Sequence, residues 1–142
     1  MLKPGKLTDS EFEEVKKHCK LGAETLLIAK NKLEFETFLD MALEIVSYHH
    51  EKWDGTGYPY MIKGEEIPLS ARIMALADVY DALVSDRVYK KAYSHVIAVE
   101  IIEESSGKHF DPQLVEIFLS VSDKLEKISI KFNDTNHTKN DF

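Results

Sequence analysis

The sequence has few of the features that mark secreted, membrane or fibrous proteins. It contains one cysteine, Cys19, so a monomer forms no internal disulfide, and such usage suits a reducing cytoplasm. No apolar run approaches the roughly 18 residues that a membrane helix needs, and the N-terminus lacks a signal-peptide pattern. There is no internal repeat and no convincing strand. These absences favour a cytoplasmic protein without a membrane segment.

The sequence also has fewer basic than acidic residues. The chain has 25 acidic and 18 basic residues, with a formal net charge of -7, so its surface as a whole repels nucleic acid. We therefore expect neither DNA nor RNA as a partner. An anionic ligand must be captured locally, by metal ions or by a few cations. The 142 residues, 44% of them hydrophobic and 30% charged, suit one globular domain with a sizeable core.

Helical patterns run through most of the chain and predict an all-α fold. Thr8 and Glu11 match a capping box, in which both side chains satisfy free backbone amides at a helix start. The first helix is expected over residues 9–21, with Gly22 as a bend or end, and a short second segment over 23–29. Further helices follow Ser94, ending by Gly107, and begin again at Asp111-Pro112. Residues 128–132 fit an extended segment, and residues 133–142 form a polar tail that we expect to be disordered.

A helix that begins near Phe35 leads into the least ordinary stretch of the sequence. Its apolar residues recur every three or four positions, which puts His49 on the line of the buried stripe and His50 on its flank. The helix must end soon after Glu51, because the glycines and proline that follow disfavour its continuation. The loop over residues 53–68 is about sixteen residues long, and loops of that length inside a compact domain are usually functional.

The next helix, expected over residues 68–85, carries acidic and apolar residues on different sides. Four residues at helical spacing form an apolar stripe: Ile73, Leu76, Tyr80 and Leu83. Asp78 and Asp81 lie on the opposite side among alanines at positions 71, 75 and 82. Small residues around a carboxylate let neighbouring backbones come close to it. We therefore expect this helix to be central to the fold and its aspartates to face a site.

Three motifs together resemble the HD-GYP family, a subgroup of the HD-type metal-dependent phosphohydrolases. They are His-His-Glu-Lys-Trp-Asp-Gly-Thr-Gly-Tyr-Pro at 49–59, Gly-Glu-Glu-Ile-Pro-Leu-Ser-Ala-Arg-Ile at 64–73 and Ala-Asp-Val-Tyr-Asp-Ala-Leu at 77–83. The likeness covers residues 3–112 and implies a helical bundle of the HD-domain type. It makes residues 1–132 a partial domain of this kind, N-terminally truncated.

The resemblance implies a metal site. His18, His49, His50 and Asp78 fall where the family places ligands for divalent transition metals such as iron or manganese. From the residues alone, a lone His18 on a half-buried helix is more often a packed or surface histidine than a ligand, and two adjacent histidines at a helix end are only suggestive. We assign no functional role to His95, near a helix start, or to His109, before the Asp111 cap. Cys19 is expected to be a small core residue and not a nucleophile.

The resemblance also implies a substrate. Residues matching Asp81, Arg87, Lys90 and Tyr58, within the Gly57-Tyr58-Pro59 motif, contact cyclic di-GMP in the family, which cleaves it to the linear dinucleotide or to GMP. Arginine binds phosphate through two hydrogen bonds and lysine acts as a point charge. Two plainer interpretations stay open: Arg87 and Lys90 suit a helix C-terminus, and the glycine-rich loop suits a simple turn.

One part of the family pattern does not occur in these residues. The family carries a His-Asp pair and a lysine in an HD-x-G-K segment upstream of the stretch that matches residues 3–8, and the aspartate bridges two metals. Without that pair we expect little or no catalysis by this chain. The alternative is a non-catalytic module that binds a cyclic dinucleotide or a diguanylate cyclase domain. An uncovered face of the helix over residues 35–49 would further favour a homodimer or a domain-swapped oligomer.

Overall fold

The computed structural model describes residues 8–32, 36–86 and 91–137. Within these ranges the regular structure is helical, as the sequence predicts, and consists of α1 (Asp9–Lys30), α2 (Glu36–Tyr48), the 3-10 turn η1 (Gly64–Glu66), α3 (Leu69–Val84), α4 (His95–Glu104) and α5 (Pro112–His137). One isolated β-bridge, between Ser106 and Phe110, is the only strand-like pairing of the described part. None of its helices combines the length and the hydropathy that crossing a bilayer requires.

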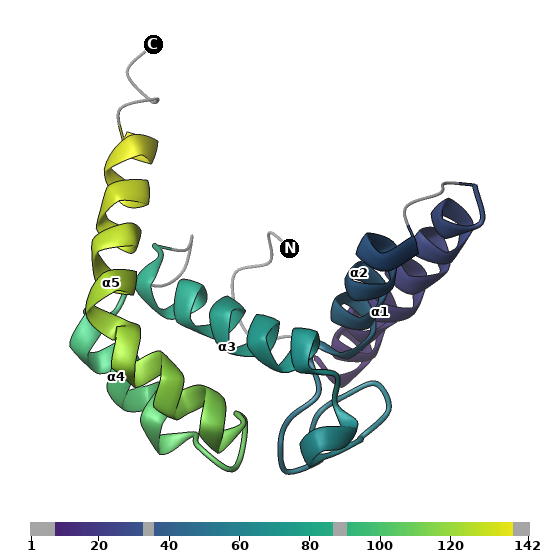
Figure 1. Ribbon diagram of the computed structural model, residues 1–142, viewed down its shortest axis with the longest axis horizontal. Coiled ribbons are helices and arrows are strands. Elements are labelled where there is room, and N and C mark those ends of the chain that lie inside the picture. Colours follow the sequence, from purple (N-terminus) through teal and green to yellow (C-terminus); the bar gives the residue numbers. More distant parts are fainter. Residues whose placement is uncertain (1–7, 33–35, 87–90, 138–142) are drawn as a thin grey trace.

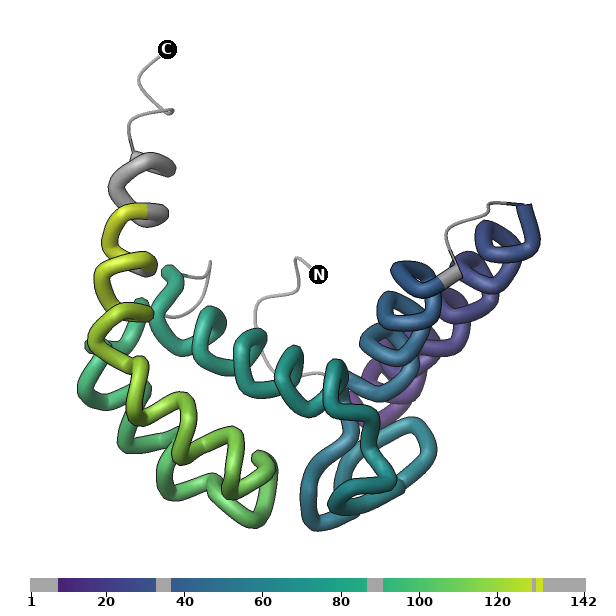
Figure 2. The backbone as a smooth tube through the Cα atoms, viewed as in Figure 1, coloured from purple at the N-terminus to yellow at the C-terminus, as the bar shows by residue number. Residues whose placement is uncertain are grey.

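The helices form a wide V around α3 (Figure 1). α1 and α2 lie side by side as a hairpin at the N-terminal end of α3, and α4 and α5 pack at its other end (Figure 2). The hydrophobic core belongs to the second group. Its buried members come from α3, α4, α5 and the turn before α5: Leu76, Tyr80, Val84, Ala98, Ile102, Phe110, Val115 and Phe118.

Local signals place several helix ends where the sequence predicts them. The Glu11 amide donates to Thr8 Oγ1 and the Thr8 amide donates to Glu11 Oε2, which completes the capping box. The Ser94 side chain accepts from the Ile97 amide at the start of α4. α2 ends at Tyr48, slightly earlier than expected, and the loop that follows contains the short turn η1. These caps are local, so the chain sequence is sufficient to identify them.

The break predicted at Gly22 is wrong. α1 continues without interruption from Asp9 to Lys30, so the expected separate segment over residues 23–29 is its second half. A Cβ atom added at Gly22 would lie 2.6 Å from Val46 Cγ1 on α2. Glycine therefore serves close packing between the two helices, and this packing offsets its cost of about 1 kcal/mol in a helix interior.

One expectation about the C-terminal region also needs correction. Residues 128–132 are helical and not extended, because α5 runs through His137. The same helix includes residues 133–137, the first half of the segment expected to be a disordered tail, and residues 138–142 lie outside the described residues. The boundary expected after residue 132 stays a prediction.

The faces of α3 differ from the predicted arrangement. Leu76 and Tyr80 are buried as expected, but Ile73 is 50% exposed. Ala71 and Ala75 are buried, whereas Asp78 and Asp81 are exposed. The alanines thus serve helix packing and do not enclose the aspartates, which face the outside of this part of the protein.

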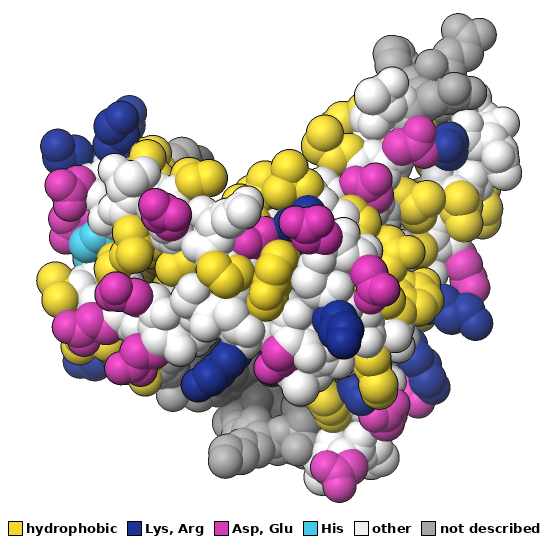
Figure 3. Space-filling view, turned by 60° about the horizontal axis from the view of Figure 1, so that its bottom comes forward, with side chains coloured by type: hydrophobic (Ala, Val, Ile, Leu, Met, Phe, Trp, Pro, Cys, Tyr) yellow, Lys and Arg dark blue, Asp and Glu magenta, His cyan; other side chains and the backbone are white. Residues whose placement is uncertain are grey.

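Hydrophobic side chains also reach the surface on α2. Phe38 is 73% exposed and Met41 is 53% exposed. The face shown in Figure 3 has hydrophobic side chains spread across it, with acidic and basic side chains among them. This exposure agrees with the expectation of an uncovered helix face, and the homodimer inferred from it stays a prediction.

Candidate functional site

Three imidazole rings converge where the α1–α2 hairpin meets the loop after α2. His18 comes from the middle of α1, while His49 and His50 directly follow the last residue of α2. The His18 ring centroid lies 5.5 Å from that of His49 and 5.0 Å from that of His50. The centroids of His49 and His50 are 4.0 Å apart. Antiparallel packing of two helices thus joins three histidines that are separated by up to 32 positions in the sequence (50 − 18 = 32).

Backbone carbonyls fix the orientation of two of these rings. His18 Nδ1 lies 2.5 Å from the Val15 carbonyl oxygen, and His49 Nδ1 lies 2.8 Å from the Ile45 carbonyl oxygen. A carbonyl oxygen only accepts hydrogen bonds, so each Nδ1 carries a proton, and in the neutral ring the lone pair is then on Nε2. A neutral imidazole whose outer nitrogen donates to a carbonyl is the usual form of a metal-binding histidine. The donor set therefore fits a transition-metal ion.

The third ring, His50, is held in its neutral form. Burial lowers its pKa from 6.5 to about 4, and the neighbouring His49 and His18, together with His109, act in the same direction. The negative charge of Asp78 opposes this shift. At neutral pH the His50 ring consequently has a lone pair available for a ligand.

This pKa shift predicts a pH dependence of stability. Between pH 6.5 and about 4 the unfolded chain binds a proton at His50 that the folded chain does not, so the free energy of unfolding should fall as pH falls through this window. Because the ring is only half-buried, solvent screening reduces the effect, and the expected loss attributable to His50 is about 1–2 kcal/mol. Urea unfolding at several pH values, with metals chelated, measures it. The variant His50→Asn should show a shallower slope, and equal slopes would contradict the assignment.

The Gly-Tyr-Pro segment packs directly onto this cluster. The Tyr58 ring stacks on His50, with centroids 4.7 Å apart and planes at 25°, and it meets the Phe12 ring edge-on at 5.6 Å. The Tyr58 amide donates to the His50 carbonyl at 3.1 Å. Burial, assisted by Cys19 and Asp78, raises the pKa of Tyr58 to about 12. The phenol therefore stays protonated and retains a hydrogen to donate.

Close backbone contact explains the glycine before Tyr58. Gly57 is buried, and a Cβ atom placed on it would lie 2.4 Å from the Lys52 nitrogen and 2.5 Å from Glu51 Cα. Real side chains do not approach a backbone so closely, so only glycine fits there. The loop can lie flat against the residues that follow His50 for this reason.

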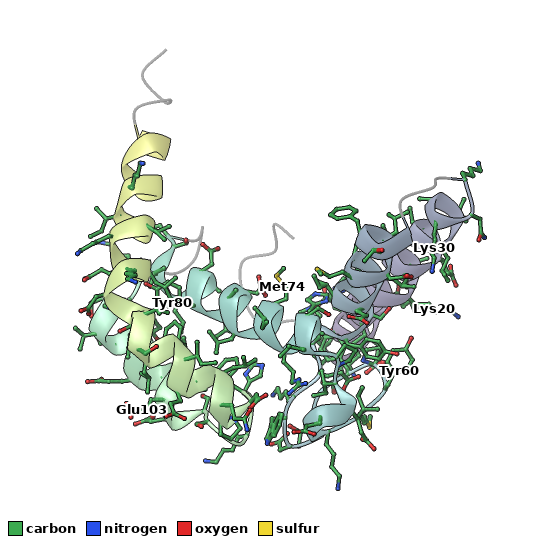
Figure 4. The ribbon with its side chains drawn as sticks, viewed as in Figure 1. Lys20, Lys30, Tyr60, Met74, Tyr80 and Glu103 are labelled. Atoms are coloured by element: carbon green, nitrogen blue, oxygen red, sulfur yellow. The ribbon has the colours of Figure 1, made fainter. Side chains whose placement is uncertain are left out.

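The buried carboxylate of Glu51, next to the histidine pair, holds another part of the loop. Glu51 is 2% exposed, and its Oε1 accepts from the Tyr60 amide at 2.6 Å. Burial raises the pKa of Glu51, and the amides of Tyr60, Met61 and Ile62 partly offset that effect. Tyr60, labelled in Figure 4, lies at the edge of the loop beside the α1–α2 hairpin. Glu51, which directly follows the histidine pair, thus holds the part of the loop around Tyr60 in place.

A second polar cluster joins α3 to the start of α5. Arg72 Nη1 donates to Asp111 Oδ2 at 2.7 Å, and the guanidinium lies 5.7 Å from the centroid of the Trp53 ring. The Trp53 amide donates to the His109 carbonyl at 3.1 Å. Sequence reasoning identified Asp111 as a helix cap but missed this ion pair, because its partners are 39 positions apart. The cluster fixes the loop that carries the histidines against the rest of the fold.

The structure brings together five of the predicted site residues. His18, His49, His50, Gly57 and Tyr58 share one cluster, and the charge of Asp78 reaches both His50 and Tyr58.

Two other predicted site residues lie at the surface. Asp81 is exposed and accepts from Ser85 Oγ at 3.3 Å, and Pro59 is exposed. Arg87 and Lys90 lie outside the described residues. Two other histidines have packing contacts: His95 Nδ1 lies 3.0 Å from the Tyr80 hydroxyl oxygen, and the His109 ring stacks on Phe110.

Sequence reasoning missed one close neighbour of the histidines. Cys19 is buried as expected, yet its Sγ lies 3.5 Å from His18 Nε2. A ring nitrogen of His18, a ring nitrogen of His50 and this sulfur lie within 4.8 Å of one another. The adjacency of His18 and Cys19 in the sequence was the available signal, although neighbouring residues on a helix point about 100° apart.

The family model described as "HD domain" matches residues 1–114 of this chain. A cyclic di-GMP phosphodiesterase of Vibrio cholerae is 58% identical over 134 residues, which are 94% of this chain and 27% of that protein. A cyclic di-GMP phosphodiesterase response regulator of Xanthomonas campestris is 41% identical over 94% of this chain and 34% of its own length. The chain therefore spans about a third or less of these relatives.

Relatives named for a different cyclic dinucleotide are similar as well. A 3'3'-cGAMP-specific phosphodiesterase of Vibrio cholerae is 41% identical over 93% of this chain and 24% of that protein. Among solved structures, a cyclic GMP-AMP specific phosphodiesterase of Vibrio cholerae superposes with a TM-score of 0.58 at 29% identity, covering 85% of this chain and 25% of that one.

Proposed function

Because the chain belongs to the HD domain family, in its HD-GYP branch, we propose that it contributes one side of a metal-dependent site for cyclic dinucleotide hydrolysis. Cyclic di-GMP is the proposed substrate, since relatives that share about half of the sequence or more are named for it. The products would be the linear dinucleotide or GMP. The observation that carries the proposal is the convergence of three imidazoles beneath a stacked tyrosine.

The proposal assigns metal binding to His18, His49, His50 and Asp78. Families with HD domains depend on metals, and imidazole nitrogen with carboxylate oxygen suits iron, manganese or a similar ion. Such an ion would polarise the phosphodiester and acidify a bound water. The chain's own part is to aim the rings at one point, which the carbonyl contacts of His18 and His49 support, and to keep His50 neutral through its lowered pKa.

The proposal assigns substrate contacts to the loop and to the C-terminal side of α3. Tyr58 keeps its phenolic proton. Its ring face would stack on a base, or its hydroxyl would donate to a phosphate oxygen. Gly57 and Pro59 set the position of that ring. Asp81, Arg87 and Lys90 would take the remaining contacts, with the two cations binding phosphate in an otherwise acidic protein.

Hydrolysis of cyclic di-GMP tests the proposal. With Mn²⁺ or Fe²⁺, a chain extended to include an upstream His-Asp segment should produce the linear dinucleotide. The 142 residues alone should be at least about 100-fold slower, because one metal-binding side of the site is missing. Chromatography of the products measures both rates. Equal turnover by the two chains would contradict the need for the upstream pair, and no turnover by the extended chain would overturn the proposed activity.

A binding role without catalysis is the second candidate. The loop presents exposed side chains at its tip, with Tyr60 56% and Met61 70% exposed, as an interaction surface would. A cyclic dinucleotide, a diguanylate cyclase domain or a second copy of this chain are the proposed partners. Calorimetric binding of cyclic di-GMP by an extended chain that never hydrolyses it would favour this role.

A further inference from the structure

A small cavity lies where the loop after the histidine pair meets α3 and the start of α5. Glu51 lines it from the loop, Arg72 and Ala75 line it from α3, and Asp111 lines it from the residue before α5. Glu51 is 2% exposed, and Ala75 and Asp111 are each 5% exposed. The cavity therefore lies inside the protein and not on its surface.

Two buried polar atoms of this lining, Glu51 Oε2 and Arg72 Nε, have no hydrogen-bond partner among the described residues. Other contacts hold both side chains in place. Glu51 Oε1 accepts from the Tyr60 amide at 2.6 Å, and Arg72 Nη1 donates to Asp111 Oδ2 at 2.7 Å. Because buried polar groups are nearly always hydrogen-bonded, an acceptor and a donor left at one cavity indicate a ligand between them.

We propose that this cavity binds a single water molecule, which accepts a hydrogen bond from Arg72 Nε and donates one to Glu51 Oε2. The centre of a water molecule has about 10 Å³ of space there. A site for one buried water needs roughly 10–15 Å³ on that measure and has about two to four polar partners. The cavity is therefore large enough for one water and too small for a larger ligand.

The charges of the lining exclude an ion as the occupant. The Arg72 guanidinium repels a cation and the Glu51 carboxylate repels an anion, and burial strengthens both effects. Water donates as well as accepts, which is the combination that one free acceptor and one free donor require. The occupant is a neutral molecule for this reason.

The water connects the histidine-bearing loop to α3. Glu51 directly follows His50, and Asp78 lies on α3 six positions after Arg72 (78 − 72 = 6). The ion pair of Arg72 with Asp111 extends the chain of hydrogen bonds to the start of α5. The consequence, a fixed placement of His50 relative to Asp78, rests on the proposed function, whereas the water site itself requires no metal.

NMR of the whole 142-residue chain, with its arginines labelled with nitrogen-15, tests the site. The chain has two arginines, so the variant Arg87→Lys assigns the Nε–H signal of Arg72. We expect a cross peak between this proton and water, with opposite signs in the laboratory-frame and rotating-frame Overhauser experiments, as a long-lived buried water gives. Proton exchange with solvent gives equal signs. No cross peak, or one with equal signs, would overturn the water site.

Two conservative variants test the bridge by urea unfolding. Arg72→Lys keeps a charge for Asp111 without an Nε–H group, and Glu51→Gln keeps Oε1 for the Tyr60 amide but loses the second acceptor. Either change removes the bridge. The double variant should therefore have an unfolding equilibrium constant about threefold or more below the value that independent single effects predict.

Glu65→Gln, at an exposed position of the same loop, is the matched control and should combine additively with Arg72→Lys. Additive effects of Glu51→Gln and Arg72→Lys would overturn the bridge between these two side chains.

Calorimetry with Mn²⁺ separates this proposal from the proposed function. A water cross peak in a chain that binds no Mn²⁺ would overturn the proposed metal site and support the water site. Mn²⁺ binding by a chain without the cross peak would overturn the water site and support the metal site.

Discussion

Replacing Asp111 with alanine is expected to lower the free energy of unfolding by about 3–5 kcal/mol. The Asp111 carboxylate is buried and accepts from Arg72 Nη1 at 2.7 Å through one oxygen and from the Gln113 amide at 2.9 Å through the other. Its removal takes away a helix cap and leaves a largely buried guanidinium without its carboxylate. Breaking such a pair costs more than the pair contributes, because the remaining charge stays desolvated.

Few neighbouring groups could replace Asp111 as a partner for the Arg72 guanidinium. Its side chain is 16% exposed, and its Nε is buried without a hydrogen-bond partner in the part of the chain that the structure describes. Trp53 covers one side of the guanidinium at 5.7 Å. Water therefore has limited access to the group that Asp111 would leave behind.

Urea unfolding measures the effect, with two matched variants. Asp111→Asn keeps an oxygen for the Gln113 amide and removes only the charge, so it should be less destabilising than alanine by about 1 kcal/mol. Combining Asp111→Ala with Arg72→Met should cost less than the sum of the single changes, because the unpaired charge is gone. A loss below about 1 kcal/mol for Asp111→Ala would contradict a structural role for this pair.

Replacing Gly57 with alanine is the second large effect that we expect. The added methyl group would meet the Lys52 nitrogen at 2.4 Å and Glu51 Cα at 2.5 Å, and both are backbone atoms that cannot rotate away. The loop must shift, which separates the Tyr58 ring from His50. We expect a loss of about 1–3 kcal/mol in the free energy of unfolding and about tenfold or more in the affinity for Mn²⁺.

Gly64 offers the matched control in the same loop. Nothing lies within 4 Å of a Cβ atom placed there, although its φ of +58° strains any other residue. Gly64→Ala should therefore cost about 1–2 kcal/mol in stability and leave Mn²⁺ affinity unchanged. Calorimetry with Mn²⁺ and urea unfolding compare the two variants. Wild-type affinity in Gly57→Ala would show that the loop contact does not position the histidines.

Much of the site was predictable because its motifs are short, continuous stretches of the sequence. The double histidine with the glycine-rich loop at 49–59 and the Asp78 motif at 77–83 are each continuous stretches of sequence, and together they suffice for the family. Their meeting with His18 was not derivable from spacing, since it depends on how tightly α1 packs on α2. The exposure of Asp78 was likewise decided by which face of α3 its neighbours cover.

The sequence by itself determined the helical class, the caps at Thr8, Ser94 and Asp111, and the loop that no helix could include, because each follows from backbone preferences of adjacent residues. Only the tertiary structure decided that Gly22 lies within a continuous helix and that Arg72 pairs with Asp111. It also decided that Cys19 meets His18 from the interior side. The physical reason is that burial and close contact between distant segments outweigh local preference wherever helices pack.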